Sequence, residues 1–167
     1  MSQNVEDRLR ALEDQLAIYQ VISAYGYAID GCNAEAVGDL YAQDGVYAVG
    51  DVGAFEGREA IKAIAADEEH LALVAAGCGH VSTLPHIVLD GDNAVATCHT
   101  MVVRNDGGDG FFIGRLSASR IELSRQADGR WRIDHRQNYL LRGDGRGSRL
   151  LGDLLSSKRA RPSVQEA

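Results

Sequence analysis

Asp30 and His80 are residue types that could act together as a general base. The histidine imidazole titrates near neutral pH, so it can accept a proton and return it. A carboxylate that accepts a hydrogen bond from one ring nitrogen fixes the tautomer, leaves the other nitrogen free and stabilises the imidazolium. The sequence also allows a simpler interpretation, in which Asp30 caps the following helix and His80 is an ordinary hydrogen-bonded strand residue.

The position of Asp30 favours a functional role. Helical spacing predicts a first helix that Asn4 caps and that runs to about Ile29, and Gly31 is a helix-stop signal. Asp30 therefore lies near a helix C-terminus, where an unpaired negative charge is mildly destabilising. A partner such as His80 would explain why the carboxylate is kept there.

Two further histidines, His86 and His99, are candidates for the same site. His86 shares a predicted strand with His80 and should face the same side, unless Pro85 introduces a bulge. His99 alternates with apolar residues on a face expected to point inward, which fits either a pocket residue or a buried core histidine. We expect His70 to be exposed on a helix. No HxH or HxxxH spacing with a nearby carboxylate is present, so no metal site is predicted.

Arg136, Tyr25 and Tyr47 could bind the substrate. His135 and Arg136 are neighbours on a predicted strand, so only one of them can face a pocket. A buried arginine is favourable when it binds an anionic leaving group, a carboxylate or a developing enolate, and the alternative is a salt bridge on a neighbouring strand. Each tyrosine could donate a hydrogen bond to a substrate oxygen or simply pack in the core.

The elements that must position these residues are helical in the first half of the chain. A short second helix is predicted from an Asn33 cap through Tyr41, and a third helix from Arg58 to about residue 75. Between them, Asp44-Gly45 reads as a turn before a strand pair at 46–49 and 54–56.

From Cys78 onward the apolar residues alternate with a period of two. Four long strands are predicted at 80–89, 93–104, 111–126 and 130–141, separated by turns rich in Gly and Asp. Such a sheet needs one face covered, and the three helices before it are available. We expect an α+β fold in which three N-terminal helices pack on a curved, mainly antiparallel sheet. Residues 1–142 would form one domain, and 143–167 a C-terminal extension with a short helix at 148–155 and a flexible tail.

Composition restricts the partners. A net charge of −7 opposes nucleic-acid binding, and the cluster Lys158, Arg159 and Arg161 is interpreted as a solvated tail. No stretch approaches the roughly 18 apolar residues of a membrane helix, and the N-terminus does not resemble a signal peptide, so a cytoplasmic protein without membrane contact is expected.

Other common chemistries lack sequence support. The three cysteines have no CxxC spacing, which gives no indication of a disulfide framework or a zinc knuckle. Phosphate-binding glycine motifs and a GxSxG elbow are also missing. The expected chemistry therefore uses no cofactor.

The order of these segments resembles the SnoaL-like proteins of the nuclear-transport-factor-2-like (cystatin-like) superfamily. The resemblance covers about residues 5–140 and rests on a helix ending in Tyr-x-x-x-x-Asp, then Tyr-Ala-Gln-Asp-Gly-Val-Tyr, Phe-Glu-Gly-Arg-Glu-Ala-Ile, a later His-x-x-x-x-x-x-Ile-x-Leu-Asp-Gly-Asp and Asp-Gly-Arg-Trp-Arg-Ile-Asp-His-Arg. The most similar branch includes hexachlorocyclohexane dehydrochlorinase, bile acid 7α-dehydratase and, more distantly, scytalone dehydratase. The resemblance implies a conical pocket in which His80 is the base for an elimination and Asp30 its partner.

By position, the resemblance also makes Tyr25 a polar pocket residue and Arg136 a pocket arginine. His99 is a departure, because relatives have other residues there. The function implied is a cofactor-independent dehydratase, dehydrohalogenase or cyclase for a small hydrophobic cyclic or polyketide- or steroid-like molecule. The alternative is a non-catalytic binding or assembly module, since the same fold serves as the small subunit of ring-hydroxylating dioxygenases. In either case an exposed sheet face favours a homodimer or homotrimer.

Overall fold

The computed structural model describes residues 4–50 and 52–156, and the basic cluster predicted as a solvated tail lies outside the described residues. Within them the helices are α1 (Val5–Asp30), α2 (Ala34–Asp39), α3 (Arg58–Ile64), α4 (Glu68–Ala75) and α5 (Arg146–Ser156). The strands are β1 (Tyr41–Val49), β2 (Gly53–Glu56), β3 (Cys78–Ser82), β4 (His86–Asp90), β5 (Asn93–Asn105), β6 (Phe111–Arg125) and β7 (Trp131–Leu140).

All described strands belong to one sheet, in the order β2-β1-β7-β6-β5-β3, with β4 also paired to β5. Strands β5, β6 and β7 form the predicted antiparallel meander. The β1–β7 pair is parallel, and the other pairs are antiparallel. The expected α+β fold with a mainly antiparallel sheet is confirmed.

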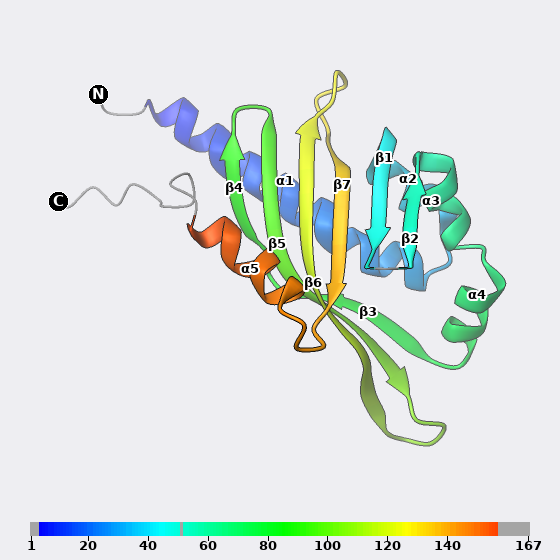
Figure 1. The fold of residues 1–167 in the computed structure, drawn as a ribbon. Coiled ribbons are helices and arrows are strands. Elements are labelled where there is room, and N and C mark those ends of the chain that lie inside the picture. The colour runs from blue at the N-terminus through cyan, green and yellow to red at the C-terminus, as the bar shows by residue number, and fades with distance from the viewer. Residues whose placement is uncertain (1–3, 51, 157–167) are drawn as a thin grey trace.

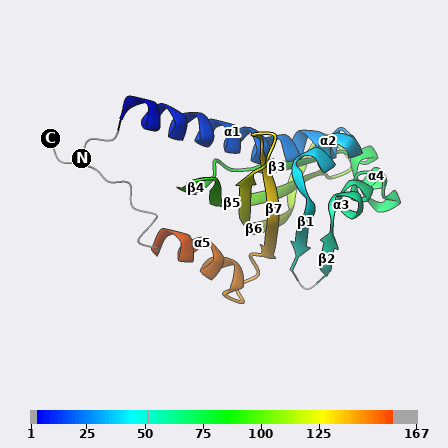
Figure 2. The same cartoon turned by 90° about the horizontal axis from the view of Figure 1, so that it is seen from above.

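The long helix α1 covers one face of the sheet, and α5 lies against the opposite face (Figure 2). Helices α2, α3 and α4 gather near one end of α1, beside β1 and β2 (Figure 1). The last residue of α1, Asp30, is therefore held near the outer strand β3. None of the described helices is both long and apolar enough to cross a membrane.

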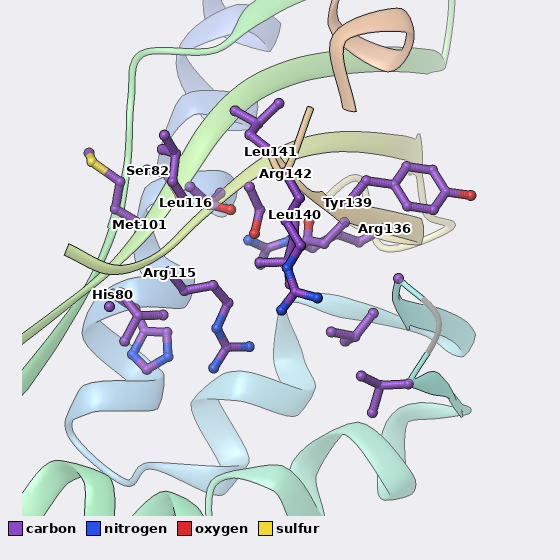
Figure 3. A pocket seen from close by; sticks show the side chains of 18 of the residues that line it. His80, Ser82, Met101, Arg115, Leu116, Arg136, Tyr139, Leu140, Leu141 and Arg142 are labelled. Carbon is purple, nitrogen blue, oxygen red and sulfur yellow. The ribbon is translucent and has the colours of Figure 1, made fainter. Parts of the chain in front are cut away.

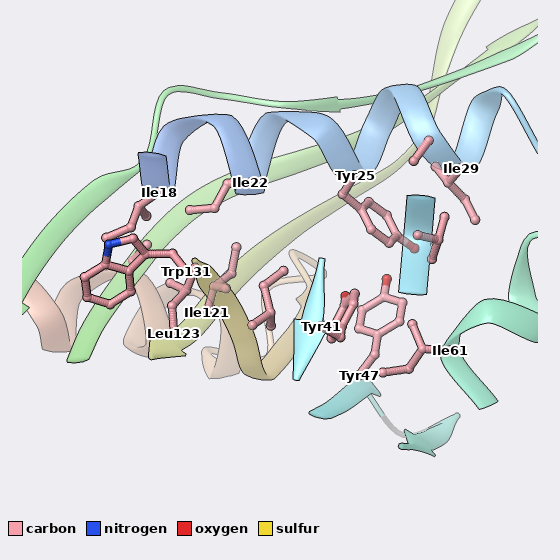
Figure 4. Close-up of a cluster of buried hydrophobic side chains, with 14 of the residues drawn as sticks. Ile18, Ile22, Tyr25, Ile29, Tyr41, Tyr47, Ile61, Ile121, Leu123 and Trp131 are labelled. Atoms are coloured by element: carbon pink, nitrogen blue, oxygen red, sulfur yellow. The ribbon is translucent and has the colours of Figure 1, made fainter. Parts of the chain in front are cut away.

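The core lies between α1 and the sheet (Figure 4). Ile18, Ile22 and Ile29 of α1 are almost fully buried against sheet residues such as Ile121 and Ile133. The leucines expected on the same stripe, at positions 9, 12 and 16, are exposed instead. At 3.6 residues per turn these leucines lie on the side of α1 opposite the buried stripe, and Asp14, not Leu16, faces the sheet ahead of Ile18.

Two predicted elements are each broken in the structure. The helix expected from Arg58 to residue 75 is two helices, because the Asp67 side chain accepts a hydrogen bond from the Glu69 N–H at 2.9 Å and caps a new helix. Four helices, not three, therefore precede the meander. The strand expected at 80–89 is also two strands, β3 and β4, which pair with different halves of β5 on either side of Pro85.

Asp44-Gly45 is not a turn between elements. Both residues lie inside β1, where the register against β7 shifts between Tyr41 and Val46. A Cβ on Gly45 would lie 3.0 Å from the Ile133 carbonyl oxygen, so a glycine lets the two backbones approach at this bulge. Tyr41, predicted to end the second helix, begins the strand and is fully buried.

Candidate functional site

Asp30 and His80 form a doubly hydrogen-bonded pair. The Nδ1 atom of His80 lies 2.6 Å from Oδ1 of Asp30, and the backbone N–H of His80 donates to Oδ2 at 2.7 Å. The carboxylate therefore holds both the ring and the main chain of β3. Because a carboxylate accepts hydrogen bonds, Nδ1 carries the proton and Nε2 is left as the basic nitrogen.

Gly26 allows this pair to form. It lies one turn before Asp30 on α1, and a Cβ at this position would come within 2.2 Å of the His80 carbonyl oxygen. The contact is with backbone, so it cannot be relieved by a side-chain rotation. The glycine thus lets α1 pack directly on β3, close enough for the Asp30 side chain to reach His80.

We expect Gly26→Ala to lower the free energy of unfolding by about 1–3 kcal/mol, because the added methyl group pushes α1 away from β3. The His80 ring should lose its hydrogen bond to Asp30 at the same time. Urea unfolding measures the first effect, and the NMR signal of the Nδ1 proton measures the second. Gly152→Ala in α5 is the matched control: its Cβ meets nothing within 4 Å. A Gly26→Ala variant as stable as this control would contradict the expected clash.

The imidazole of His80 is neutral at pH 7. Burial lowers its pKa from the ordinary value, and this effect outweighs the opposing hydrogen bond and negative charge of Asp30. A neutral ring with its proton on Nδ1 is the form that a general base requires.

We predict that His80 titrates below the ordinary histidine value of about 6.5. The pKa is lower in the folded than in the unfolded chain, so the stabilisation from this group is complete above the unfolded-state value. That stabilisation is lost as the pH falls through the folded-state value. Nitrogen-15 NMR of the imidazole measures both the pKa and the tautomer. A pKa above 6.5, or a proton on Nε2 at neutral pH, would contradict the assignment.

His70 was expected to be exposed, and that expectation was wrong. The side chain is buried, its Nε2 lies 2.8 Å from the Ile29 carbonyl oxygen, and its ring centroid is 5.9 Å from that of His80. A carbonyl only accepts, so Nε2 of His70 carries a proton. The break before α4 turns this residue inward, and the Asp67 capping signal could have revealed it.

His80 faces two neighbouring cavities, of about 550 Å³ and 1280 Å³, and lines both. A volume of 550 Å³ is in the range of small-molecule sites. The smaller cavity, shown in Figure 3, opens between the sheet and the segment after β7. Its walls are largely apolar and include Val49, Val81, Met101, Leu116 and Leu140.

Arg136 lies in the wall of this cavity, 3% exposed, beside Tyr25 and Tyr47. Its guanidinium carbon is 4.3 Å from the centroid of the Tyr25 ring and 5.1 Å from that of Tyr47. Among the described residues no carboxylate lies within ion-pair distance of Arg136. Burial raises the pKa of Tyr25, so this phenol stays neutral and does not balance the charge. The salt bridge considered for Arg136 is not formed.

Two residues that the sequence did not single out, Ser119 and Asn138, connect Arg136 to Tyr47. The Ser119 hydroxyl donates to Asn138 Oδ1 at 2.5 Å and accepts from Arg136 Nε at 3.2 Å. The Asn138 amide donates to the Tyr47 hydroxyl at 3.0 Å. With its oxygen accepting this bond, Tyr47 has its own proton available for a ligand. Polar residues at alternate positions of two buried strands were the available signal.

The other two candidate histidines lie outside both cavities. His99 was expected either to line the pocket or to be a buried core histidine, but it is exposed, because its neighbour Cys98 is the β5 residue that points into the core. Half-buried His86 follows the break at Pro85, and its Nε2 is buried without a hydrogen-bond partner in the described chain. Alternation along the predicted strand therefore misplaced His99, whereas for His86 the interruption considered at Pro85 is present.

Asp30, Cys78 and His80 bring an oxygen, a sulfur and a nitrogen within 4.8 Å of one another. A metal ion there would have to replace the hydrogen bond between Asp30 and His80. Burial, with a smaller effect of Asp30, raises the pKa of the Cys78 thiol, which disfavours the thiolate that binds metals. The geometry fits a hydrogen-bonded pair better than a ligand set.

Comparisons with known proteins agree with this architecture. The SnoaL-like domain family matches residues 10–137. The fold is similar to that of an NTF2-like protein with a cystatin-like fold from Novosphingobium aromaticivorans, with 37% identity and a TM-score of 0.84 over 90% of this chain and 99% of that chain. A comparison with curated proteins found no match.

Two more distant structures share the fold. Rv3472 from Mycobacterium tuberculosis, a protein of unknown function, is 21% identical, with a TM-score of 0.71 over 95% of this chain and 86% of that chain. LinA is 17% identical, with a TM-score of 0.66 over 80% of this chain and 89% of that chain.

Proposed function

Because the chain belongs to the SnoaL-like domain family, we propose that it is a lyase or isomerase that works without a cofactor and uses His80 as its general base. The observation that carries this proposal is the Asp30–His80 pair at the edge of a largely apolar cavity. The resemblance to lyases of this family, noted from the sequence, supports the same assignment.

The proposed reaction begins at Nε2 of His80. This nitrogen takes a proton from a carbon next to an electron-withdrawing group, and the electrons of the broken C–H bond move into the substrate. Asp30 accepts a hydrogen bond from the imidazolium that forms and stabilises its charge. Loss of water, loss of halide or ring closure then consumes the electron pair.

Arg136 and Tyr47 would stabilise the negative charge that develops on the substrate. Arg136 is held by Ser119, and Asn138 leaves the Tyr47 proton free to donate. Donors fixed in advance in a site with little water lower the barrier more than the same groups would in solvent. The apolar walls favour a hydrophobic ring-bearing substrate.

Turnover of a pool of ring compounds tests the proposed activity. The pool should contain β-hydroxy ketones, halogenated rings and open-chain polyketide-like ketones, and mass spectrometry should detect loss of water, loss of hydrogen halide or an isomeric product. We expect at least one class to be converted by the wild-type protein and not by the His80→Ala variant. Equal conversion by both proteins would rule out His80 as the base.

A further inference from the structure

Two exposed arginines line the smaller cavity without an ion-pair partner among the described residues. Arg115 is on β6 and Arg142 follows β7, and both are exposed and line the cavity. Ser117 pairs with Leu140, and the Leu141 N–H donates to the Leu116 carbonyl at 3.0 Å. The chain turns at this point, where the Arg142 N–H donates to the Leu140 carbonyl at 3.0 Å, so Arg142 directly follows the last residue bonded to β6. In Figure 3 both side chains extend into the cavity.

Two like charges on the wall of one cavity repel each other. Some other arginines of this sheet have acidic partners, such as Asp128 for Arg132 at 2.7 Å and Glu122 for Arg120 at 3.0 Å. No ion pair of this kind is formed by Arg115 or Arg142 among the described residues. An anion bound between the two guanidinium groups would remove the repulsion.

The charge of the residues around the smaller cavity also favours an anionic ligand. Its described lining contains Arg115, Arg136, Arg142 and Arg146 and a single carboxylate, Asp144, which pairs with Arg146 at 2.9 Å. The lining is therefore positive although the chain carries a net charge of −7. The larger cavity on the other side of His80 differs, because three of its lining residues are acidic: Asp67, Glu68 and Glu69.

We propose that the ligand of the smaller cavity is a ring compound with an ionised acid group, and that Arg115 and Arg142 bind this group. The guanidinium fork matches the two oxygens of a carboxylate, which allows paired, charge-assisted hydrogen bonds. The acid group is held by the exposed arginines, and the ring lies along the apolar wall of the same cavity, which His80 and Arg136 also line. The inference rests on the proposed function for the reacting end of the ligand and adds the class of substrate.

Binding of matched acid and amide pairs tests this inference. The probes are ring carboxylic acids of one to four rings, each compared with its neutral carboxamide by isothermal titration calorimetry. We expect at least one acid to bind the wild-type protein about 10-fold or more tightly than its amide. The preference should weaken as salt rises, because both arginines are exposed. If no acid binds more tightly than its amide, the inference is overturned.

The variant carrying Arg115→Gln and Arg142→Gln should lose the preference for the acid while still binding the amide. Both side chains are exposed, so the double variant should fold as the wild type does. Arg130→Gln is the control, because Arg130 is an exposed arginine that lines neither cavity. If the double variant keeps the full preference for the acid, Arg115 and Arg142 do not bind the acid group, and the inference is overturned.

The His80→Ala variant separates this inference from the proposed reaction. If this variant still binds the acid more tightly than the amide and also keeps full turnover, the catalytic role of His80 is rejected. The proposed binding of the acid group by Arg115 and Arg142 would be unaffected. If the variant loses turnover but the wild-type protein binds acid and amide equally well, the role of His80 is supported and the proposed acid site is rejected.

Discussion

His80→Ala should lower kcat by about 10²- to 10⁴-fold on whichever substrate the protein converts, the range that a positioned general base contributes. The variant removes the only basic nitrogen of the Asp30 pair and leaves the cavity walls in place. Affinity for the substrate should therefore change much less than kcat. Initial rates over a range of substrate concentrations separate the two effects.

His99→Ala is the matched control for this variant. It also replaces a histidine of the same sheet, but His99 is exposed and lines neither cavity. Its kcat should stay within about twofold of the wild-type value, since surface substitutions away from a site have small effects. If His99→Ala were inactive and His80→Ala active, the face assigned to strand β5 and the identity of the base would both be wrong.

Asp30→Asn tests the partner. The amide has no charge to stabilise the imidazolium, and its NH₂ group can turn toward Nδ1 and favour the wrong tautomer. We expect kcat to fall strongly while the fold is retained, because Asn has nearly the same shape as Asp. An Asp30→Asn variant with full kcat would show that the carboxylate serves only to hold β3.

Each residue of the pair could be placed on its own element from the sequence. Asp30 ends a 26-residue helix at a glycine signal, and His80 lies on the five-residue outer strand β3. The contact between the two elements, however, depends on Gly26, and no local pattern distinguishes a glycine that permits close packing from one that is merely tolerated. The resemblance to a family supplied that tertiary information.

Two predictions about elements failed where a helix cap or a proline interrupted a regular sequence pattern. Asp67 starts a new helix and carries His70 inward, and Pro85 divides a strand and changes which side chains face the cavity. His99 was misplaced for a different reason: it alternates with Met101 and Val103, but the buried residues of β5 on either side of it are Cys98 and Val102. For Ser119 and Asn138, alternating polar residues could indicate a buried polar network, but not which side chains meet, because the contacts join neighbouring strands.

Arg136→Met should raise stability and lower activity. A buried guanidinium without a carboxylate partner carries a large desolvation penalty, and hydrophobic residues of similar volume often replace buried charges with a gain of about 1–4 kcal/mol. Loss of the stacking on Tyr25 and Tyr47 opposes this gain, so we expect a net increase of about 1 kcal/mol in the free energy of unfolding. A charge kept at the expense of stability is typical of a functional site.

The same substitution should reduce kcat by about 10²- to 10³-fold, because the donor that faces the developing charge is lost. Urea unfolding and initial rates on one preparation give both numbers. Arg120→Met, on the strand next to Arg136, is the control: Arg120 is half-exposed and paired with Glu122, so its stability should change by less than about 0.5 kcal/mol and its kcat hardly at all. If Arg136→Met instead unfolded more easily and kept its kcat, Arg136 would be a structural residue, stabilised by its tyrosines, and the developing charge would have to be met by Tyr47 alone.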